Sequence, residues 1–220
     1  MKHIVVTIDG PAGTGKSTVA REVAKKLGFV YLDTGALYRA AAVAIDDSGC
    51  KTSNEQDCVR VLSRATINFA DEHVFLNGLD VTQRIRSQRI SSLASEIAVH
   101  PSVRNALLDL QRSFRGKSSL VAEGRDTGSV VFPDADIKIY LDASQEERAR
   151  RRYEELISKG FAVSYDQVLN DLRERDSRDS SRATAPLVIP QHAIVVDTTH
   201  LSIENVVRIV LDKVRRYLAD

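Results

Sequence analysis

The chain has 220 residues, 43% of them apolar, which favours one domain with an insertion over two independent domains. Its 31 basic and 30 acidic side chains leave a formal charge of +1, so no bulk field favours DNA, RNA or an anionic membrane surface. No run of about 18 apolar residues and no cleavable leader stands out, so we expect a soluble, cytoplasmic protein.

Short β-branched runs alternate along the chain with longer patterns of helical period. Strands are predicted near residues 3–8, 28–32, 118–123, 136–141 and 193–197. Helices are predicted near residues 16–27, 35–48, 82–99, 101–114, 144–159, 165–176 and 201–218. Because the strand runs do not alternate strictly, they suit a sheet that helices cover on both faces. The sequence therefore predicts a three-layer α/β fold with a five-stranded parallel sheet, whose ligands collect at the carboxyl ends of the strands.

The connection between the second and third predicted strands, residues 33–117, is several times longer than an ordinary crossover. Within it, residues 66–69 and 73–76 are short strand candidates, and Asn77-Gly78 is a strong tight-turn signal before residues 79–81. We therefore expect this insertion to form a subdomain that contains a small antiparallel sheet.

The cysteines and histidines show no pattern of a metal site or a disulfide framework. Cys50 and Cys58 lack a C-x-x-C pair, so we expect reduced, structural thiols. His100 precedes Pro101 and is expected at a helix boundary. No catalytic or ligand role is assigned to any histidine: His3, His73, His100, His192 or His200.

Residues 10–18, GPAGTGKST, follow an apolar run and lead into a helical pattern. Their spacing matches G-x-x-x-x-G-K-[ST], in which backbone N–H groups surround a polyphosphate and the lysine neutralises its outer charge. The hydroxyl of Ser17 is then placed to ligate Mg²⁺, and the start of the helix adds positive potential. The segment predicts a nucleoside triphosphate site made of Gly10, Pro11, Ala12, Gly13, Thr14, Gly15, Lys16, Ser17 and Thr18.

Arginines interleaved with carboxylates recur between Arg148 and Arg182. One interpretation is a solvated helical surface held by i,i+4 ion pairs. The other is a mobile flap, or lid, whose arginines exclude water and stabilise the charge of a transferring phosphoryl group. Gly160 is the expected end of the first helix of this lid.

A phosphate loop is shared by several classes of protein, and other features separate them. GTPases need a base-reading N-K-x-D string, which is absent. Transport and motor ATPases usually show a second strand ending in a carboxylate; residues 120–123, LVAE, could mimic it, so this class stays open. A regulatory ATP-binding module is a further alternative, although balanced charge and the lack of an aromatic-basic strand platform count against RNA. The long insertion and the arginine segment favour an enzyme that seats two phosphorylated molecules face to face.

Four blocks together make a more specific pattern: GPAGTGKST at 10–18, DTGALYR at 33–39, EGRDTGSVVFPDA at 123–135 and ERDSRDSSRATAPL at 174–187. With them, nearly the whole chain resembles bacterial cytidylate kinase, a family of P-loop nucleoside monophosphate kinases. The resemblance implies in-line transfer of the γ-phosphoryl group of ATP to CMP or dCMP, which gives CDP or dCDP in pyrimidine nucleotide metabolism. It also implies Mg²⁺ and a closing lid. We expect a monomer that binds these small molecules but neither nucleic acid nor membrane.

The resemblance implies a division of one P-loop kinase domain into three parts. The core would comprise residues 1–33, 118–147 and 186–220. Residues 34–117 would form the monophosphate-binding subdomain, and residues 148–185 the lid.

The family's pattern, carried across by position, places a set of polar side chains around the monophosphate: Thr34, Arg39, Ser95, Arg104, Arg125, Asp126, Arg175, Asp179 and Arg182. Cytosine offers a 4-amino donor beside acceptors at N3 and O2. Asp126 would accept from the amine, and the donors would come from Arg104, Arg182 and Thr34, where relatives often have serine. Uracil reverses two of these groups, so cytosine should be preferred, with a UMP or dTMP kinase as the nearest rival.

The remaining side chains of this set have other implied roles. Arg39 and Arg125 would grip the acceptor phosphate as guanidinium forks. The sugar would face Ser95, Arg175 and Asp179. Two structural alternatives stay open, because Asp126 could merely orient Arg125, and Asp179 could pair with Arg175 or Arg182.

The implied mechanism needs no activated serine, cysteine or histidine, because a monophosphate oxygen is already a competent nucleophile. Positioning and charge would dominate. Lys16, the loop amides and Mg²⁺ would hold ATP, and Arg125 would act with Arg39 to aim the acceptor. The lid arginines Arg148 and Arg152 would stabilise the transferring group.

Overall fold

The structure is a computed structural model and describes residues 3–70, 73–116 and 118–219. The chain forms two compact units, one of Met1–Leu32 with Phe114–Asp220 and the other of Asp33–Ser113. They are called the sheet unit and the inserted unit below. Within the described ranges, no helix is long and apolar enough to span a membrane.

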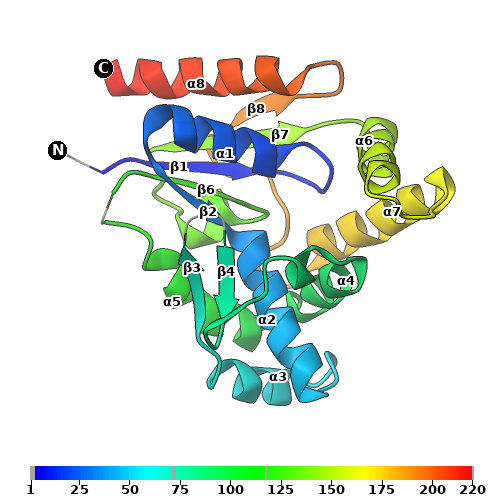
Figure 1. The fold of residues 1–220 in the computed structure, drawn as a ribbon. Coiled ribbons are helices and arrows are strands. Elements are labelled where there is room, and N and C mark those ends of the chain that lie inside the picture. The colour runs from blue at the N-terminus through cyan, green and yellow to red at the C-terminus, as the bar shows by residue number, and fades with distance from the viewer. Residues whose placement is uncertain (1–2, 71–72, 117, 220) are drawn as a thin grey trace. The chain divides into compact units, whose positions relative to one another are not determined.

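A five-stranded sheet organises the sheet unit (Figure 1). Its strands are β1 (Val5–Asp9), β2 (Val30–Asp33), β6 (Leu120–Gly124), β7 (Ile137–Asp142) and β8 (Ile194–Asp197). Their order is β2-β6-β1-β7-β8, and β1 pairs in parallel with both β6 and β7. The register places Asp9 of β1 beside Gly124 of β6. Two loops that carry predicted site residues therefore begin at neighbouring strand ends.

Helices α1 (Lys16–Leu27) and α8 (Ile203–Ala219) lie against each other along one face of this sheet (Figure 1). Their apolar faces pack on alternating residues of β1 and β7, in a cluster that includes Ile8, Val19, Ile139, Val207 and Val210. Helices α6 (Gln145–Ser158) and α7 (Tyr165–Ser181) pack on each other around Ala149 and Leu172. Gly160, with φ 81°, follows the end of α6, as expected.

The inserted unit has its own core and its own antiparallel sheet. The sheet comprises β3 (Ile67–Ala70), β4 (His73–Leu76) and β5 (Leu79–Asp80), in that order. Asn77 and Gly78 both have positive φ, 51° and 80°, which is what a tight hairpin turn between β4 and β5 requires. The helices of the unit are α2 (Thr34–Ser48), α3 (Glu55–Leu62), α4 (Gln88–Ile97) and α5 (Pro101–Arg112), with a short 3₁₀ turn η1 (Arg84–Arg86).

The predicted fold class, a five-stranded parallel α/β sheet with a small antiparallel sheet in an insertion, is confirmed. The continuous helix predicted over residues 82–99 is wrong. Ser87 has an extended backbone, with ψ 149°, and its hydroxyl accepts a hydrogen bond from the N–H of Ile90, so it ends η1 and begins α4. Helix α3 was not predicted, and α7 extends five residues beyond the predicted end at residue 176, to Ser181. His100 does lie at the start of α5, before Pro101.

Candidate active site

The phosphate loop joins the central strand β1 to α1, and two of its glycines are required by close packing. Gly10 has φ +148°, and a Cβ there would lie 2.0 Å from the carbonyl oxygen of Leu141. Gly13 has φ +83°, and its Cβ would lie 2.9 Å from Cβ of Arg148. The backbone thus passes close to the end of β7 and to α6, and no larger residue fits this path.

Lys16 begins α1 and is 5% exposed. Its Nζ donates a hydrogen bond of 2.6 Å to the carbonyl oxygen of Pro11 across the loop. Burial, helped by the positive charges of Arg125 and Arg175, lowers the pKa of Lys16 from 10.5 to about 7, against the opposing effect of Glu123. A polyphosphate in the loop would supply negative charge and favour the protonated lysine.

Ser17 and Glu123 bring two oxygen groups together at the start of α1. The hydroxyl of Ser17 donates to Oε1 of Glu123 at 2.6 Å, and the Tyr31 hydroxyl lies 3.4 Å from the same atom. Oxygen groups of this kind suit Mg²⁺, which commonly takes one or two protein ligands together with phosphates and waters. In the part of the chain that the structure describes, no group of three or more His, Cys, Asp or Glu could hold a metal alone. The Ser17 hydroxyl and the Glu123 carboxylate are oxygen groups that fit a magnesium ion bound together with phosphates.

Arg125, Asp179 and Arg182 form a buried ionic cluster beyond the end of β6. Arg125 donates from Nε to Oδ2 of Asp179 at 2.9 Å, and Arg182 pairs with the other carboxylate oxygen. Asp179 is 2% exposed. Burial alone would raise its pKa, but Arg125, Arg182 and Arg175 hold that pKa below 3.8. The pairing of Asp179 with Arg182, left open by the sequence, is therefore present.

Arg148 is a buried arginine of α6 that connects separate segments. Its guanidinium donates to the carbonyl oxygens of Ala143, at 3.0 Å, and of Ala12 in the phosphate loop, at 3.1 Å. It also forms an ion pair with Asp176 of α7. One planar group with several donors therefore holds α6, α7 and the phosphate loop together.

The other arginines of α6 differ from Arg148 in exposure. Arg150 is half exposed and pairs with Glu147 and Glu154, which matches the solvated helical surface considered for this segment. Arg152, with 26% of its side chain exposed, donates to Glu155 at 2.8 Å. The solvated-surface interpretation therefore describes Arg150, whereas the lid interpretation of this segment stays a prediction.

Four of the predicted monophosphate-binding side chains belong to the inserted unit: Thr34, Arg39, Ser95 and Arg104. Arg39 pairs at 3.0 Å with Asp33, which also accepts from the N–H of Ala36 and so caps α2. Arg104 lies over the ring of Tyr38, 5.5 Å from its centroid. Ser95 is 6% exposed, and its hydroxyl has no hydrogen-bond partner in the described structure. Since buried polar atoms are normally satisfied, this hydroxyl is a candidate for contact with a ligand.

The remaining predicted side chains, Arg125, Asp126, Arg175, Asp179 and Arg182, belong to the sheet unit. Several polar residues of this unit that the sequence did not assign to the site also lie among them. Glu123 was noted only as a strand-end carboxylate, while Asp176 and Asp9 were given no role. The signal for Glu123 was its place at the end of a predicted strand. The contacts of Asp9 and Asp176 depend on tertiary packing, which the sequence pattern does not contain.

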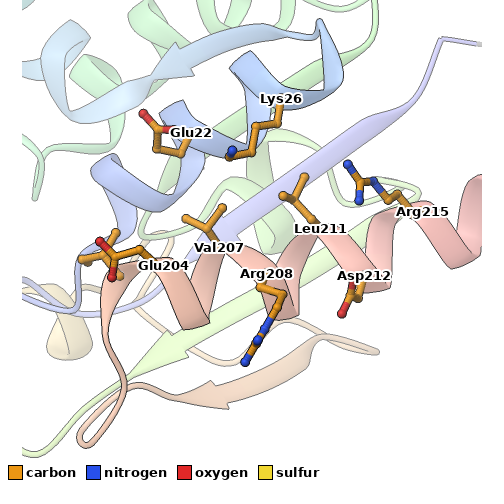
Figure 2. Close-up of a pocket in the computed structure, with 9 residues that line it drawn as sticks. Glu22, Lys26, Glu204, Val207, Arg208, Leu211, Asp212 and Arg215 are labelled. Carbon is orange, nitrogen blue, oxygen red and sulfur yellow. The ribbon is translucent and has the colours of Figure 1, made fainter.

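A groove of about 350 Å³ lies elsewhere, between α1 and α8 (Figure 2). Its apolar lining comes from Ile203, Val207 and Leu211, and charged side chains such as Lys26 and Arg215 stand at its sides. None of the predicted site residues lines this groove. The groove therefore shares no lining residue with the predicted site, although Ile203 lies beside Gly15 of the phosphate loop.

Comparisons with known proteins point to one family. The family model described as Cytidylate kinase matches residues 6–216. The chain is 50% identical over 208 residues to a cytidylate kinase of Polynucleobacter necessarius, covering 94% of this chain and 97% of that protein. It is 47% identical over 213 residues to a cytidylate kinase of Caldanaerobacter subterraneus, with coverage of 97% and 95%.

Solved structures share the fold at low sequence identity. An uncharacterized protein of Eubacterium ventriosum has a TM-score of 0.54 at 11% identity and covers 98% of this chain and 99% of its own. A gluconokinase of Sinorhizobium meliloti has a TM-score of 0.50 at 14% identity, with coverage of 97% and 92%. These likenesses concern the fold alone. The matching family model and relatives, which span nearly the whole chain, show that this protein belongs to the cytidylate kinase family.

Proposed function

We propose that this chain transfers the γ-phosphoryl group of ATP to CMP and dCMP, forming ADP and CDP or dCDP. The observation that carries this function is the near-complete match to cytidylate kinases, in a chain whose phosphate loop holds a buried lysine. A monophosphate oxygen needs no activating base, so the protein's contribution is positioning and charge.

The donor site is proposed to be residues 10–18, with the loop amides and Lys16 on the phosphates of ATP. The short contact between Ser17 and Glu123 supports a magnesium site at the start of α1, with Ser17 as a ligand. The ion, when bound, neutralises phosphate charge. Burial lowers the pKa of Lys16 to about 7. The negative charge of a bound polyphosphate would favour the protonated form, so Lys16 would then carry a positive charge.

The acceptor site is proposed to be formed by the side chains that the family's pattern indicates. Asp126 would accept from the 4-amino group of cytosine, and Arg39 with Arg125 would bind the acceptor phosphate. The buried hydroxyl of Ser95, which lacks a partner in the described structure, supports a contact with the sugar. Asp179, already bonded to Arg125 and Arg182, would keep both guanidinium groups oriented.

The lid is proposed to be residues 148–185, with Arg148 and Arg152 acting on the transferring phosphoryl group. The hydrogen bond from Arg148 to the carbonyl oxygen of Ala12 supports this placement, because it puts the guanidinium beside the phosphate loop. An arginine there would stabilise the negative charge that spreads over the phosphoryl oxygens. We further propose a cytoplasmic monomer that binds neither nucleic acid nor membrane.

An assay of ADP release tests this function. The chain is offered ATP and Mg²⁺ with CMP, dCMP, UMP, dTMP, AMP or GMP in turn. We expect CMP and dCMP to exceed UMP in kcat/KM by about tenfold or more, since uracil leaves the Asp126 carboxylate facing a carbonyl oxygen. A Lys16→Ala variant purified in parallel controls for contaminating kinases. A preference for UMP or dTMP would contradict the base assignment, and no ADP with any acceptor would favour a regulatory module.

A further inference from the structure

Asp9 is a fully buried carboxylate between the two loops that carry the proposed chemistry. It is the last residue of β1 and comes directly before Gly10 of the phosphate loop. Its Oδ1 accepts from the N–H and the hydroxyl of Thr127, each at 2.8 Å. Its Oδ2 accepts from the N–H of Gly128 at 2.7 Å. Asp9 thus connects the start of one loop to the residues that directly follow Asp126.

Such a side chain is unfavourable in a core unless its hydrogen bonds are specific. Burial raises the pKa of Asp9, with a smaller contribution from the nearby charge of Asp126, while the bonds to Gly128 and Thr127 oppose the rise. A valine would fill this strand position without burying a charge. Unlike valine, the carboxylate can accept hydrogen bonds from two successive backbone N–H groups and a hydroxyl at the same time.

The segment that Asp9 holds also approaches β1 more closely than ordinary residues allow. Thr127–Val131 forms a single turn of π-helix, labelled η2, with a backbone path unlike that of a regular helix. A Cβ on Gly128 would lie 2.7 Å from Oγ1 of Thr7 and 3.1 Å from Oδ2 of Asp9. The irregular turn is therefore packed directly on the strand that leads into the phosphate loop.

We propose that Asp9 is a positioning residue for phosphoryl transfer: it fixes the Arg125–Asp126 segment relative to the phosphate loop. The inference rests on the proposed function, in which the loop holds the donor and Arg125 and Asp126 hold the acceptor. In-line transfer requires the reacting atoms to be about 3–3.5 Å apart in the right orientation, and a displacement of about 1 Å can reduce the rate about a hundredfold. The carboxylate of Asp9 sets that distance without touching either nucleotide.

The test compares three variants with the wild type. Asp9→Asn keeps the shape of the side chain but turns an N–H₂ group toward at least one of the three donors. We expect kcat/KM for CMP to fall about thirtyfold, with both a lower kcat and a higher KM for CMP, while the Kd for ATP alone changes less than about threefold. Thr127→Val removes only the hydrogen bond of the hydroxyl and should lower kcat/KM for CMP about threefold. Val210→Ala, on the buried face of α8, controls for lost stability.

Amide hydrogen exchange gives a readout that does not depend on activity. Without its carboxylate acceptor, the N–H groups of Thr127 and Gly128 should exchange at least about tenfold faster in Asp9→Asn than in the wild type. In Val210→Ala their protection should be lost only to the extent that global stability falls. This comparison is made on the full-length protein without added nucleotide.

The outcomes separate this inference from the proposed function. Unchanged kinetics for CMP in Asp9→Asn, or an equal defect in a Val210→Ala protein of the same Tm, would overturn the positioning role. So would a large loss of ATP affinity with no change for CMP, which would place Asp9 with the donor loop alone. If the wild type phosphorylates no monophosphate, the proposed function fails. In that case, unchanged exchange at Thr127 and Gly128 would overturn the structural connection as well, and faster exchange would support it.

Discussion

The guanidinium of Arg148 donates a hydrogen bond of 3.1 Å to the carbonyl oxygen of Ala12 in the phosphate loop. The same side chain bonds the carbonyl oxygen of Ala143 and pairs with Asp176. A buried arginine that satisfies three acceptors has little freedom to rotate. The first helix of the proposed lid is therefore connected to the donor loop through one side chain.

Arg148→Lys should lower kcat about tenfold to a hundredfold, because an ammonium cannot reach all three acceptors in the geometry of the guanidinium. Arg150→Lys, at an exposed position of the same helix, is the matched control. Its kcat should remain within about twofold of the wild-type value. Steady-state kinetics at saturating ATP and CMP measure both. An equal decrease in the two variants would show that Arg148 has no special role.

Lys16→Met should abolish phosphoryl transfer yet increase stability when no nucleotide is present. Burial lowers the pKa of this lysine from 10.5 to about 7. The charged form therefore costs stability in full below about pH 7, and the cost disappears as pH rises toward 10.5. The Tm of Lys16→Met should exceed that of the wild type most at pH 6 and least near pH 10, as thermal unfolding across this range would measure. A lower Tm for the variant at pH 6 would contradict the effect of burial.

The same pKa predicts how donor use depends on pH. Since the free enzyme loses the Lys16 proton near pH 7, kcat/KM for ATP should fall about tenfold between pH 8 and pH 9, where ATP itself is fully ionised. Initial rates at saturating CMP measure this profile, with protein stability checked at each pH. Calorimetry in two buffers of different ionisation enthalpy should show proton uptake on ATP binding near pH 8. A flat profile would mean that Lys16 stays protonated throughout.

Asp126→Ala should lower kcat/KM for CMP by about 2–3 kcal/mol and leave ATP affinity unchanged, because it removes the acceptor for the 4-amino group. The kcat/KM for UMP should fall much less, so the variant should discriminate less between CMP and UMP. Asp134→Ala, an exposed carboxylate paired with Arg115, serves as the control. Normal CMP turnover in Asp126→Ala would remove this residue from the base site.

Local sequence patterns were sufficient for most of the fold and for the strand, loop and helix arrangement around residues 10–18. The glycine spacing, the parallel strands and the Asn77-Gly78 hairpin each depend on a few adjacent residues, and the structure has all of them. Helix α3 was missed, although its start carries a local signal: Asn54 caps it by accepting from the N–H of Asp57. The break at Ser87 was hidden because apolar residues on both sides continue one helical pattern.

The contacts within the site were harder to predict, because they join residues that are far apart in the chain. Arg148 and Arg150 are nearly equivalent in the sequence, and only tertiary packing buries one and exposes the other. The partners of Asp9 are 118 and 119 residues away. Residue roles carried across from a family resemblance predict which side chains contact nucleotides, but they do not predict which other residues orient those side chains.

The position of β1 at the centre of the sheet has a consequence for synthesis. The partners of Val5 and Val6 are Leu120 and Ile137, so the whole Asp33–Ser113 unit is translated before β1 can pair. That unit has its own hydrophobic core and can fold around it. The apolar strand β1, VVTID, has both edges unpaired until β6 and β7 have been translated. A ribosome that stalls before Leu120 would therefore release a polypeptide with one ordered region and one segment prone to aggregate. The phosphate loop is therefore translated before the two strands that pair with β1, and it acquires its shape only after they have formed.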